Sequence, residues 1–388
     1  MAPFVPDEVK PDRLAVVVPT YWGPVQGYEL GKPSPAYDHP TPSAGEGTLP
    51  RLLDSLAGIP APEFRVILVV GATREEIAPA AERRVKDISR PYRGTFPVEV
   101  VGAAALGGLK ERVRKPPFPI SLSGYGNIRN VGLLAGLLSG ADVLVLLDDD
   151  EVVEPDHLAR AVDCLRRAEA LAGGPVGVGG PYLDAAGEPF LAQGPPCGNP
   201  FLDKAHHLNA ALERLLAAGG PVPTPVAFGG NMVLGRALAR KVPFDPLIPR
   251  GEDIDYVLSS WLLGYKFYFD RELTVTHLPP REPRPSPCEA LRRDVVRFLY
   301  QREKLAVAHS LGLSLPIGLG PYPGRFLQED LELQAAQALQ RVCGWEGKRV
   351  QGFLREVKGW ALHHGGDYFW HLRASKGDGC PSWFPPAP

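Results

Sequence analysis

Four acidic residues stand side by side in the sequence: Asp148, Asp149, Asp150 and Glu151. They directly follow residues 143–147, an unbroken apolar run with β-branched side chains, which is typical of a strand buried on both faces of a parallel sheet. Adjacent carboxylates repel one another and are costly to bury without compensation. The cluster therefore requires open solvent or a cation, and Mg²⁺ and Mn²⁺ prefer carboxylate oxygens alongside phosphates. The plain alternative is an acidic turn before the helix expected from Asp156.

A glycine-rich turn at residues 124–126 leads into a predicted helix that carries Arg129 and Asn130. The backbone N–H groups at such a helix start favour anions. Arg129, in the first turns of this helix, is a candidate contact for such an anion. An ion pair between Arg129 and the acidic turn explains the residue equally well, and the sequence leaves both interpretations open.

Three more carboxylates gather where another helix is expected to begin, directly after Gly251: Glu252, Asp253 and Asp255. A carboxylate at a helix N-terminus is an ordinary cap, because it complements the helix dipole. It can also serve as a general base. The sequence alone does not decide which of the three would do so.

Further polar and aromatic residues follow the ends of other predicted strands: Thr20, Tyr21 and His277. Tyr21 could stack on a nucleobase or pack in the core. His277 ends an alternating Thr-Val-Thr-His segment, where a hydrogen-bonded structural histidine is the commoner case. Gly229 and Gly230, inside a predicted strand, indicate a place where the backbone approaches a ligand closely.

The elements that must position these residues alternate between strand and helix, which predicts an α/β fold with a mostly parallel sheet. Strands are expected over residues 14–19, 64–70, 98–101, 143–147, 176–178, 226–233, 266–270 and 273–277. Helices are expected over residues 49–57, 73–88, 124–139, 156–171, 205–218, 251–263, 287–310, 327–342 and 347–363. Thr73 and Glu76 have the spacing of a capping box. Residues 103–121, a basic stretch with Lys110, Arg112, Arg114 and Lys115, are expected to be irregular.

The composition fits a soluble protein with a packed core. The chain has 388 residues, 44% of them hydrophobic and 22% charged, enough for one large α/β domain and an appendage. A net charge of −2 argues against a nucleic-acid binder that works through bulk electrostatics. No apolar run approaches membrane-spanning length and residues 1–13 lack a signal peptide's apolar core, so a cytoplasmic location is predicted. The five cysteines have no CxxC spacing, so reduced thiols are expected.

With these motifs in this order, the chain resembles glycosyltransferases of the GT-A fold, particularly those of the family 2 type. The shared pattern comprises the segments at residues 16–21, 124–130, 147–150, 229–231, 251–253 and 274–277. The resemblance implies a nucleotide-diphospho-sugar transferase domain over residues 1–280, with a Rossmann-like, mostly parallel sheet and helices on both faces. Residues 23–47 are then an inserted loop, and residues 281–388 a C-terminal helical extension and tail.

The resemblance also implies a role for each candidate residue. The nucleotide-sugar donor would be bound by Thr20, Tyr21, Arg129, Asn130, Asp148 and Asp149. A divalent cation, Mn²⁺ or Mg²⁺, would be held by Asp148, Asp150 and His277. Asp253, or Glu252 beside it, would be the base that deprotonates the acceptor hydroxyl in an inverting reaction. A bridging cation suits this chemistry, because the leaving diphosphate gains charge as the glycosidic bond breaks.

Several alternatives stay open. Family members usually carry an acidic residue that touches the base, whereas this chain has Gly71-Ala72-Thr73, so the base of the donor is undetermined. Retaining relatives share the acidic turn and the late histidine but use no such general base. A sugar-1-phosphate nucleotidyltransferase needs a glycine-rich basic loop after the first strand, where this chain has Thr20-Tyr21-Trp22. A non-catalytic nucleotide-sugar-binding protein would tolerate the loss of the metal ligands, which are intact here.

No motif names the acceptor, since a sugar, a glycerate-like small molecule, a lipid or a glycan would each present a hydroxyl. The insert around Tyr37, Asp38 and His39 and the C-terminal helices both lie outside the shared pattern. We expect both to wall the acceptor site, and the insert to become ordered when the donor binds. Association into a homo-oligomer is compatible with the sequence and is not specified by it.

Overall fold

The structure of the protein is a computed structural model that describes residues 13–31, 36–43, 45, 47–60, 63–113, 116–281 and 284–374. Two of the basic residues noted above, Arg114 and Lys115, and residues 375–388 of the expected tail lie outside the described residues. Among the helices of the described ranges, none combines the length and the apolar character needed to pass through a bilayer.

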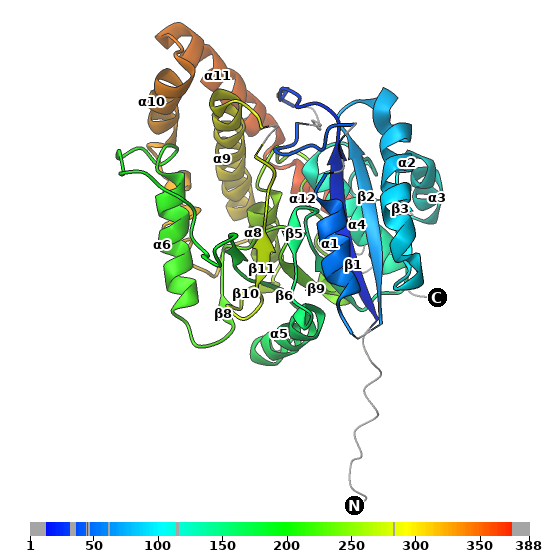
Figure 1. Ribbon diagram of the computed structural model, residues 1–388. Coiled ribbons are helices and arrows are strands. Elements are labelled where there is room, and N and C mark those ends of the chain that lie inside the picture. Colours follow the sequence, from blue (N-terminus) through cyan, green and yellow to red (C-terminus); the bar gives the residue numbers. More distant parts are fainter. Residues whose placement is uncertain are drawn as a thin grey trace, which may run out of the picture.

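The centre of the molecule is an eight-stranded sheet with the order β3-β2-β1-β4-β9-β6-β10-β8 (Figure 1). Its strands are β1 (Leu14–Trp22), β2 (Phe64–Ala72), β3 (Val98–Val101), β4 (Val143–Leu146), β6 (Val176–Gly179), β8 (Val222–Pro223), β9 (Met232–Gly235) and β10 (Lys266–Phe269). Strand β1 pairs in parallel with β2 and β4, β2 with β3, and β6 with β10. Strand β9 runs antiparallel between β4 and β6, and β8 is antiparallel at one edge. The predicted α/β class with a mostly parallel sheet is confirmed.

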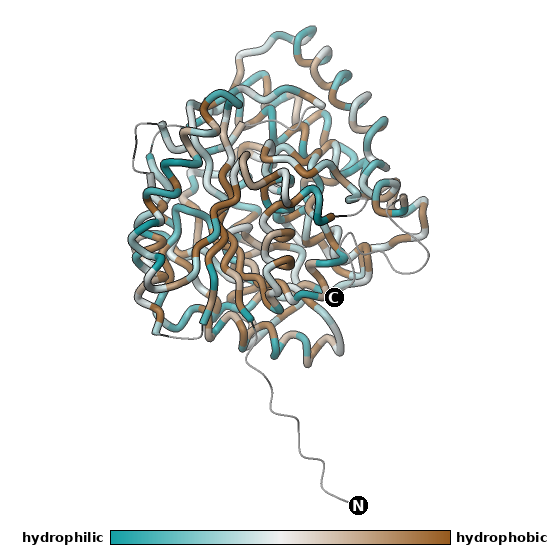
Figure 2. The backbone as a smooth tube through the Cα atoms, turned by 90° about the vertical axis from the view of Figure 1, so that its right-hand side faces the viewer, coloured by the Kyte–Doolittle hydropathy of each residue, from teal (hydrophilic) through white to brown (hydrophobic). Residues whose placement is uncertain are grey.

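Helices cover both faces of this sheet, as predicted. One face packs against α1 (Leu49–Ala57), α2 (Ala78–Ser89) and α5 (His157–Ala172), and the other against α4 (Tyr125–Leu138), α7 (Arg236–Ala239) and α8 (Glu252–Leu262). Because successive side chains of a strand point to opposite faces, Val16 of β1 packs in the first core and Val17 in the second. Figure 2 shows the apolar strand segments running through the middle of the molecule.

The stretch expected to be irregular is instead largely a helix, α3 (Ala103–Arg112), followed by an irregular segment. The prediction gave too much weight to the basic residues. Three alanines and Leu106 favour a helix, and Lys110 and Arg112 fall in the last turn, where positive charge complements the helix dipole.

Two local predictions on either side of the sheet are also wrong. Thr73 does not cap a helix, because the chain first makes the 3₁₀ turn η1 (Glu75–Ile77) after Arg74. The Thr73 hydroxyl is buried and has no hydrogen-bond partner in the described ranges. The strand predicted from residue 226 begins only at Met232. The preceding residues form a turn, in which the Asn231 N–H donates to the Phe228 carbonyl.

A second, three-stranded sheet joins β5 (Glu151–Val152), β11 (Val275–His277) and β7 (Tyr182–Leu183) in that order. Strand β11 pairs antiparallel with β5, so that His277 lies opposite Glu151. On its other side β11 runs parallel to β7, with Val275 opposite Tyr182. This small sheet brings the late histidine to the acidic turn although 126 positions separate His277 from Glu151.

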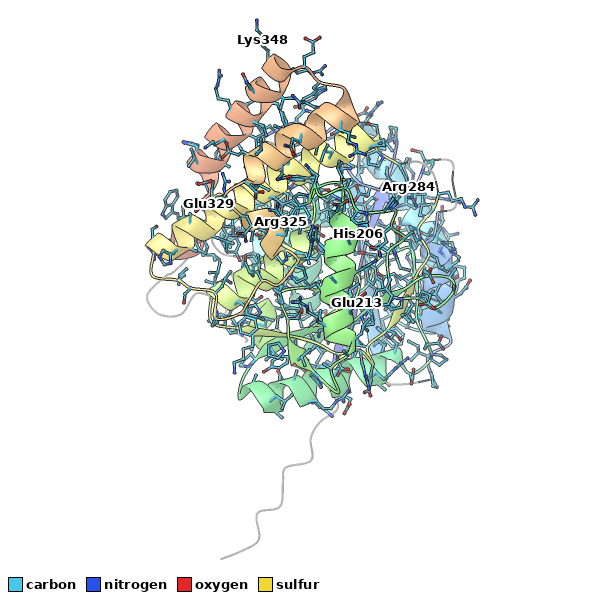
Figure 3. All side chains as sticks on the ribbon, turned by 90° about the vertical axis from the view of Figure 1, so that its left-hand side faces the viewer. His206, Glu213, Arg284, Arg325, Glu329 and Lys348 are labelled. Carbon is cyan, nitrogen blue, oxygen red and sulfur yellow. A yellow bond between two sulfur atoms is a disulfide. The ribbon has the colours of Figure 1, made fainter. Side chains whose placement is uncertain are left out.

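The C-terminal third is helical, as predicted, and most of its helices pack in a third core, which also includes Ile254 of α8 and Phe269 of β10. It contains α9 (Pro287–Ser310), α10 (Leu331–Cys343), α11 (Gly347–His364), α12 (Asp367–Ala374) and the turn η3 (Gly324–Leu327). Helix α12 continues the helical region into what was expected to be tail. Helix α6 (Lys204–Leu216) joins α9, α10 and α11 in this core. Figure 3 shows α6, with His206 and Glu213, beside α9, and Lys348 at the start of α11.

In the N-terminal half, the turn η2 (Arg90–Gly94) follows α2.

The expectation of reduced cysteines is wrong for one pair. Cys288 in the first turn of α9 and Cys343 at the end of α10 form a disulfide across 55 positions of sequence. Cys164 and Cys197 are free thiols, and Cys380 lies outside the described residues. The sequence spacing carried no sign of the bond, because only the packing of α10 along α9 brings the two sulfur atoms together.

Candidate active site

A cavity of about 330 Å³ lies where the acidic turn, the insert and helices α6, α8 and α9 meet. Its wall includes Tyr21, Asp38, His39, Tyr125, Arg129, Asp148, Asp149, Asp150, Tyr182, Lys204, Phe228, Arg250, Glu252, Asp253, His277, Arg297 and Tyr322. Of the residues to which the resemblance assigns a role, all but Thr20 and Asn130 line this cavity. The structure therefore brings the separate motifs together at one place.

Thr20 and Asn130 support the site from outside. The Thr20 hydroxyl donates a hydrogen bond of 2.5 Å to Asp149 Oδ2. Asn130 Nδ2 donates to the Phe244 carbonyl, and Asn130 Oδ1 accepts from the Phe244 N–H, so both ends of the amide are occupied by backbone. The structure thus brings Thr20 to the acidic turn but leaves Asn130 in the scaffold.

The three aspartates of the turn have different surroundings. Loss of solvent, followed by the charge of Asp150, raises the pKa of Asp149 to about 8. Burial also tends to raise the pKa of Asp150, but the hydrogen bond and charge of His277 outweigh it, so this pKa is lowered. Asp148 accepts hydrogen bonds from Arg129 Nη2 at 3.0 Å and from the Tyr182 hydroxyl at 3.2 Å. Asp150 is therefore the aspartate that stays ionised without a guanidinium partner.

Asp150 and His277 form the pair best suited to hold a divalent cation. Asp150 Oδ2 and His277 Nε2 are 3.3 Å apart at the cavity wall, and burial of the imidazole is outweighed by Asp150, which raises the His277 pKa. Carboxylate oxygen and neutral imidazole nitrogen are a donor set that Mn²⁺ accepts. No group of three or more His, Cys, Asp or Glu side chains suited to a metal ion occurs in the described ranges. These two residues fit such an ion as partial ligands.

Arg129 is almost completely buried and ties the acidic turn to the start of α8. Its Nε donates to Glu252 Oε1 at 2.6 Å, its Nη2 to Asp148, and its Nη1 to the Gly229 carbonyl at 3.0 Å. Of the two interpretations left open by the sequence, the structure has the ion pair. Arg129 therefore fixes the position of Asp148 relative to α8.

The glycines of the 229–231 motif make room for these side chains. A Cβ atom at Gly229 would lie 2.3 Å from Arg129 Nη2, and one at Gly230 would lie 2.0 Å from Glu151 Oε1. The Gly230 N–H also donates to the Tyr182 hydroxyl at 2.7 Å. The close approach predicted for this backbone is thus made by protein side chains of the site.

The three carboxylates at the start of α8 differ in their hydrogen-bond partners. Glu252 is buried against Arg129, and burial raises its pKa. Asp255 is buried against Lys304 Nζ at 2.6 Å. Asp253 is partly exposed and lines the cavity, with its Oδ2 accepting from the Gly229 N–H at 3.1 Å and its Oδ1 from the Ile254 N–H. Asp253 is the one of the three without a cationic hydrogen-bond partner.

The insert contributes one wall of the cavity through Asp38 and His39. That this wall borders an acceptor stays a prediction. Tyr37 stacks on Tyr21 with 4.1 Å between ring centroids, and Tyr125 packs edge-on against both. One face of Tyr21 is therefore covered by protein. Asp38 pairs with Arg250 at 2.9 Å and with Arg293 at 2.7 Å, which ties the insert to α9. Its ordering on donor binding stays a prediction.

Sequence reasoning missed several residues of the wall: Tyr182, Lys204, Arg250, Arg297 and Tyr322. Tyr182 lies in the small sheet, where its ring stacks on Phe228 and contacts His277. The cationic residues lie on α6, before α8 and on α9, in segments without a recognisable motif. Arg250, directly before the Gly-Glu-Asp segment, was the one that its position in the sequence could have indicated.

Searches with the sequence find no matching family model. No curated protein matches it either. Solved structures similar to the chain include S. aureus TarS 1-349, at 14% identity over 95% of this chain and 93% of that one, with a TM-score of 0.42. The mannosyltransferase PcManGT from Pyrobaculum calidifontis, in complex with GDP-Man and Mn²⁺, is 14% identical over 96% and 88%, with a TM-score of 0.45. GalNAc-T7 with UDP, GalNAc and Mn²⁺ is 14% identical over 92% and 58%, with a TM-score of 0.41. Likenesses of this degree assign no activity, so the function is argued from the side chains of the site.

Proposed function

We propose that this protein is a glycosyltransferase that moves a sugar from a nucleoside-diphosphate donor to a hydroxyl acceptor. The observation that carries the proposal is the meeting of the acidic turn, His277 and Asp253 at one cavity. Asp150 and His277 would hold a divalent cation, which neutralises charge on the departing diphosphate. Tyr21, at the end of β1, lines the same cavity on the side of the insert.

Asp253 is proposed as the general base of an inverting reaction. A base must be able to accept a proton, and Glu252 and Asp255 are each already paired with a buried cation. Asp253 faces the cavity from the start of α8, and two backbone N–H groups orient its carboxylate. It can therefore take the proton from an acceptor hydroxyl as that oxygen attacks the sugar.

The metal requirement is the direct test. Donor hydrolysis or transfer, screened over nucleotide sugars, should stop with EDTA and return with Mn²⁺ or Mg²⁺. Asp150→Ala should fold, as judged by circular dichroism, and lose turnover. Lys348→Ala, at an exposed position at the start of α11, is the matched control and should keep full activity. Full activity of the wild type in EDTA would contradict the proposal.

A retaining reaction is the second candidate, because it needs the same cation site but no base at Asp253. An NMR time course of the product separates the two. Inversion of the anomeric configuration supports Asp253 as base, whereas retention would remove that role and leave the transferase assignment in place.

A further inference from the structure

A cluster of positive charge occupies the part of the cavity wall built by α6, α9 and the segment before α8. Its cations are Lys204, Arg250 and Arg297, which line the cavity, and the buried Arg293, which does not. Asp38 and Asp294 are the carboxylates that pair with Lys204, Arg250 and Arg293. We call it the cationic cluster. Asp294 Oδ2 accepts from Lys204 Nζ at 2.5 Å and from Arg250 Nη1 at 3.4 Å, so one oxygen serves two cations.

Arg297 is the member with the most unpaired donor nitrogens among the described residues, two against one in Arg293. Its side chain is 97% buried, and its Nε and Nη2 atoms have no hydrogen-bond partner among the described residues. The guanidinium lies over the Phe298 ring, 4.6 Å from the centroid, and lines the cavity. Leaving donors of a buried charge unpaired is costly, so the arrangement points to a ligand that accepts from them.

The charge balance indicates the sign of that ligand. Four cations face two paired carboxylates, and even with the nearby Asp253 the positive charge is in excess. Burial, together with the charge of Arg250, lowers the pKa of Lys204 to about 8 although Asp294 opposes this. The single carboxylate of Asp294 interacts with Lys204, Arg250 and Arg297 together. An anion bound here would add negative charge beside these three cations.

The position of Arg297 relates this anion to the chemistry. Its guanidinium packs against Gly251, where a Cβ atom would lie 2.0 Å from Arg297 Nη1. Gly251 is two residues before Asp253 and takes a left-handed conformation, with φ of 69°. Nε, one of the two unpaired donors, lies 2.7 Å from the same Cβ position, and the charge of Asp253 acts on the Arg297 guanidinium. An anion bound by Arg297 is therefore close to the proposed base and to the hydroxyl that it would deprotonate.

We infer that the acceptor is a hydroxyl compound with a carboxylate or phosphate group close to its reacting hydroxyl, and that Arg297, Lys204 and Arg250 bind this group. The inference rests on the proposed function, because it takes Asp253 as the base. A bidentate guanidinium suits either anion, since both present two oxygens in one plane. The nucleotide diphosphate of the donor is the other possible source of such oxygens, and the experiment separates the two.

Binding measurements with inorganic phosphate test the cluster without any need for turnover. Calorimetry or thermal shift is run on the wild type, on Arg297→Met and on Lys348→Met, whose exposed side chain lies on α11. Phosphate should bind the wild type and the Lys348 variant alike, and at least tenfold more weakly to Arg297→Met. The nucleoside diphosphates UDP, GDP, ADP, CDP and dTDP are then tested with Mn²⁺. At least one nucleoside diphosphate should bind Arg297→Met with the same affinity as the wild type. Phosphate should still bind the wild type in the presence of that nucleotide.

Three results would overturn the inference. Phosphate could fail to bind the wild type, or could bind Arg297→Met with unchanged affinity. Alternatively, phosphate could compete with the nucleoside diphosphate while Arg297→Met weakens both, which would assign the cluster to the donor. If no nucleoside diphosphate binds but phosphate binding still depends on Arg297, the proposed function fails and the anion site stands. Should Arg297→Met not fold, Lys204→Met is measured in the same way.

Discussion

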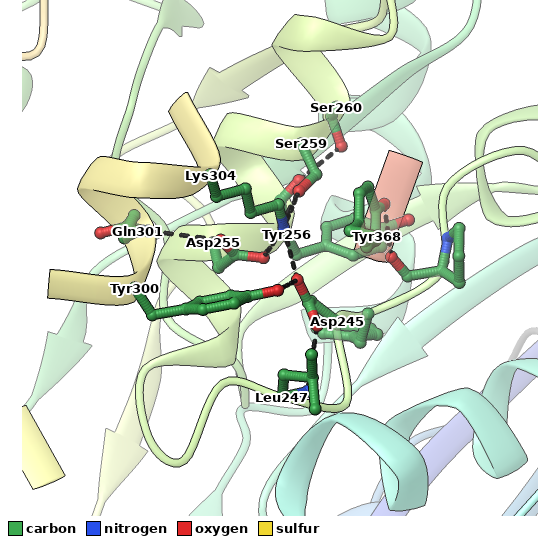
Figure 4. A network of polar contacts seen from close by, with 12 residues as sticks. Asp245, Leu247, Asp255, Tyr256, Ser259, Ser260, Tyr300, Gln301, Lys304 and Tyr368 are labelled. Atoms are coloured by element: carbon green, nitrogen blue, oxygen red, sulfur yellow. Dashed lines mark hydrogen bonds and ion pairs between the residues drawn. The ribbon is translucent and has the colours of Figure 1, made fainter. Parts of the chain in front are cut away.

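Helix α9 contributes to two clusters of buried charge, about two turns apart, and they are built differently. In the network around Lys304, the ammonium donates to Asp245 at 2.9 Å, to Asp255 at 2.6 Å and to Ser259 at 3.0 Å (Figure 4). All three N–H donors of Lys304 are therefore used. In the cationic cluster, Arg297 on the same helix keeps two donor nitrogens unpaired at the wall of the cavity.

The difference separates a structural role from a binding role. Asp245 in the network also accepts from the Tyr300 hydroxyl at 3.0 Å and from the Leu247 N–H, so both of its carboxylate oxygens are occupied. A buried ammonium whose donors are all paired has none left to offer a ligand and stabilises only the fold. A buried cation with unpaired donors lowers stability until a ligand accepts from them, which is the usual trade between stability and function.

The largest effect, a loss in the free energy of unfolding, is expected from Lys304→Met. It leaves the buried carboxylates of Asp245 and Asp255 without their cation, and breaking a buried pair in this way costs about 3–5 kcal/mol. Urea unfolding monitored by fluorescence measures the loss. A free energy of unfolding within about 1 kcal/mol of wild type would show that the network is not the structural element described here.

The next largest effect is expected on catalysis, from Asp253→Asn. Loss of the general base should lower kcat by about a hundredfold, equivalent to about 2.7 kcal/mol in activation free energy. The free energy of unfolding should change little, because the amide still accepts from the Gly229 N–H. Steady-state kinetics at saturating donor give kcat. Asp255→Asn, in the Lys304 network, should instead lower the free energy of unfolding. If both variants lose kcat equally and neither is destabilised, Asp253 and Asp255 do not have the separate catalytic and structural roles described here.

A smaller loss in the free energy of unfolding, about 2 kcal/mol, is expected when Asp294 is protonated at low pH. Burial opposes its ionisation, but Lys204, Arg250 and Arg297 outweigh that and lower its pKa to about 2. A carboxyl whose pKa is depressed by folding stabilises the fold above its unfolded pKa of about 4, and this contribution is lost as the pH falls from about 4 through about 2. The difference in urea midpoint between wild type and Asp294→Asn should therefore be smaller at pH 2.5 than at pH 5. A constant difference between them would contradict the assignment.

The smallest effect on stability is expected from Arg297→Met without ligand. Because two of its nitrogens are unpaired, removing the guanidinium forfeits little hydrogen bonding and relieves the cost of a buried charge. The free energy of unfolding should stay within about 1 kcal/mol of wild type or rise. A loss as large as that of Lys304→Met, measured side by side, would show that both clusters are structural.

The framework of the fold was accessible from the sequence because its signals are local. The apolar runs gave β3 and the helices α1 and α9 with the bounds they have in the structure. The motifs also led to the cavity, since the carboxyl ends of parallel strands meet at one edge of a sheet. The antiparallel direction of β9 could not be predicted, because the apolar pattern of a short buried strand is the same whether it pairs in parallel or antiparallel.

The charged face of α9 could not be predicted, because a stripe of polar residues on a helix ordinarily faces solvent. Here Asp294, Arg297, Gln301 and Lys304 follow helical spacing, and all four are buried. Their partners come from distant segments, such as Asp38 of the insert and Asp245 before α8. Local patterns carry no information about such contacts, so the second half of the site was missed.

The disulfide between Cys288 and Cys343 has a consequence for the unfolded chain. It closes a loop that spans 55 positions and starts in the first turn of the helix that carries both clusters. In the chain-entropy account, a loop of this size removes about 4 kcal/mol of conformational freedom from the denatured ensemble. Under oxidising conditions α9 and α10 therefore begin folding already tethered, whereas the reduced chain must first find that contact by diffusion.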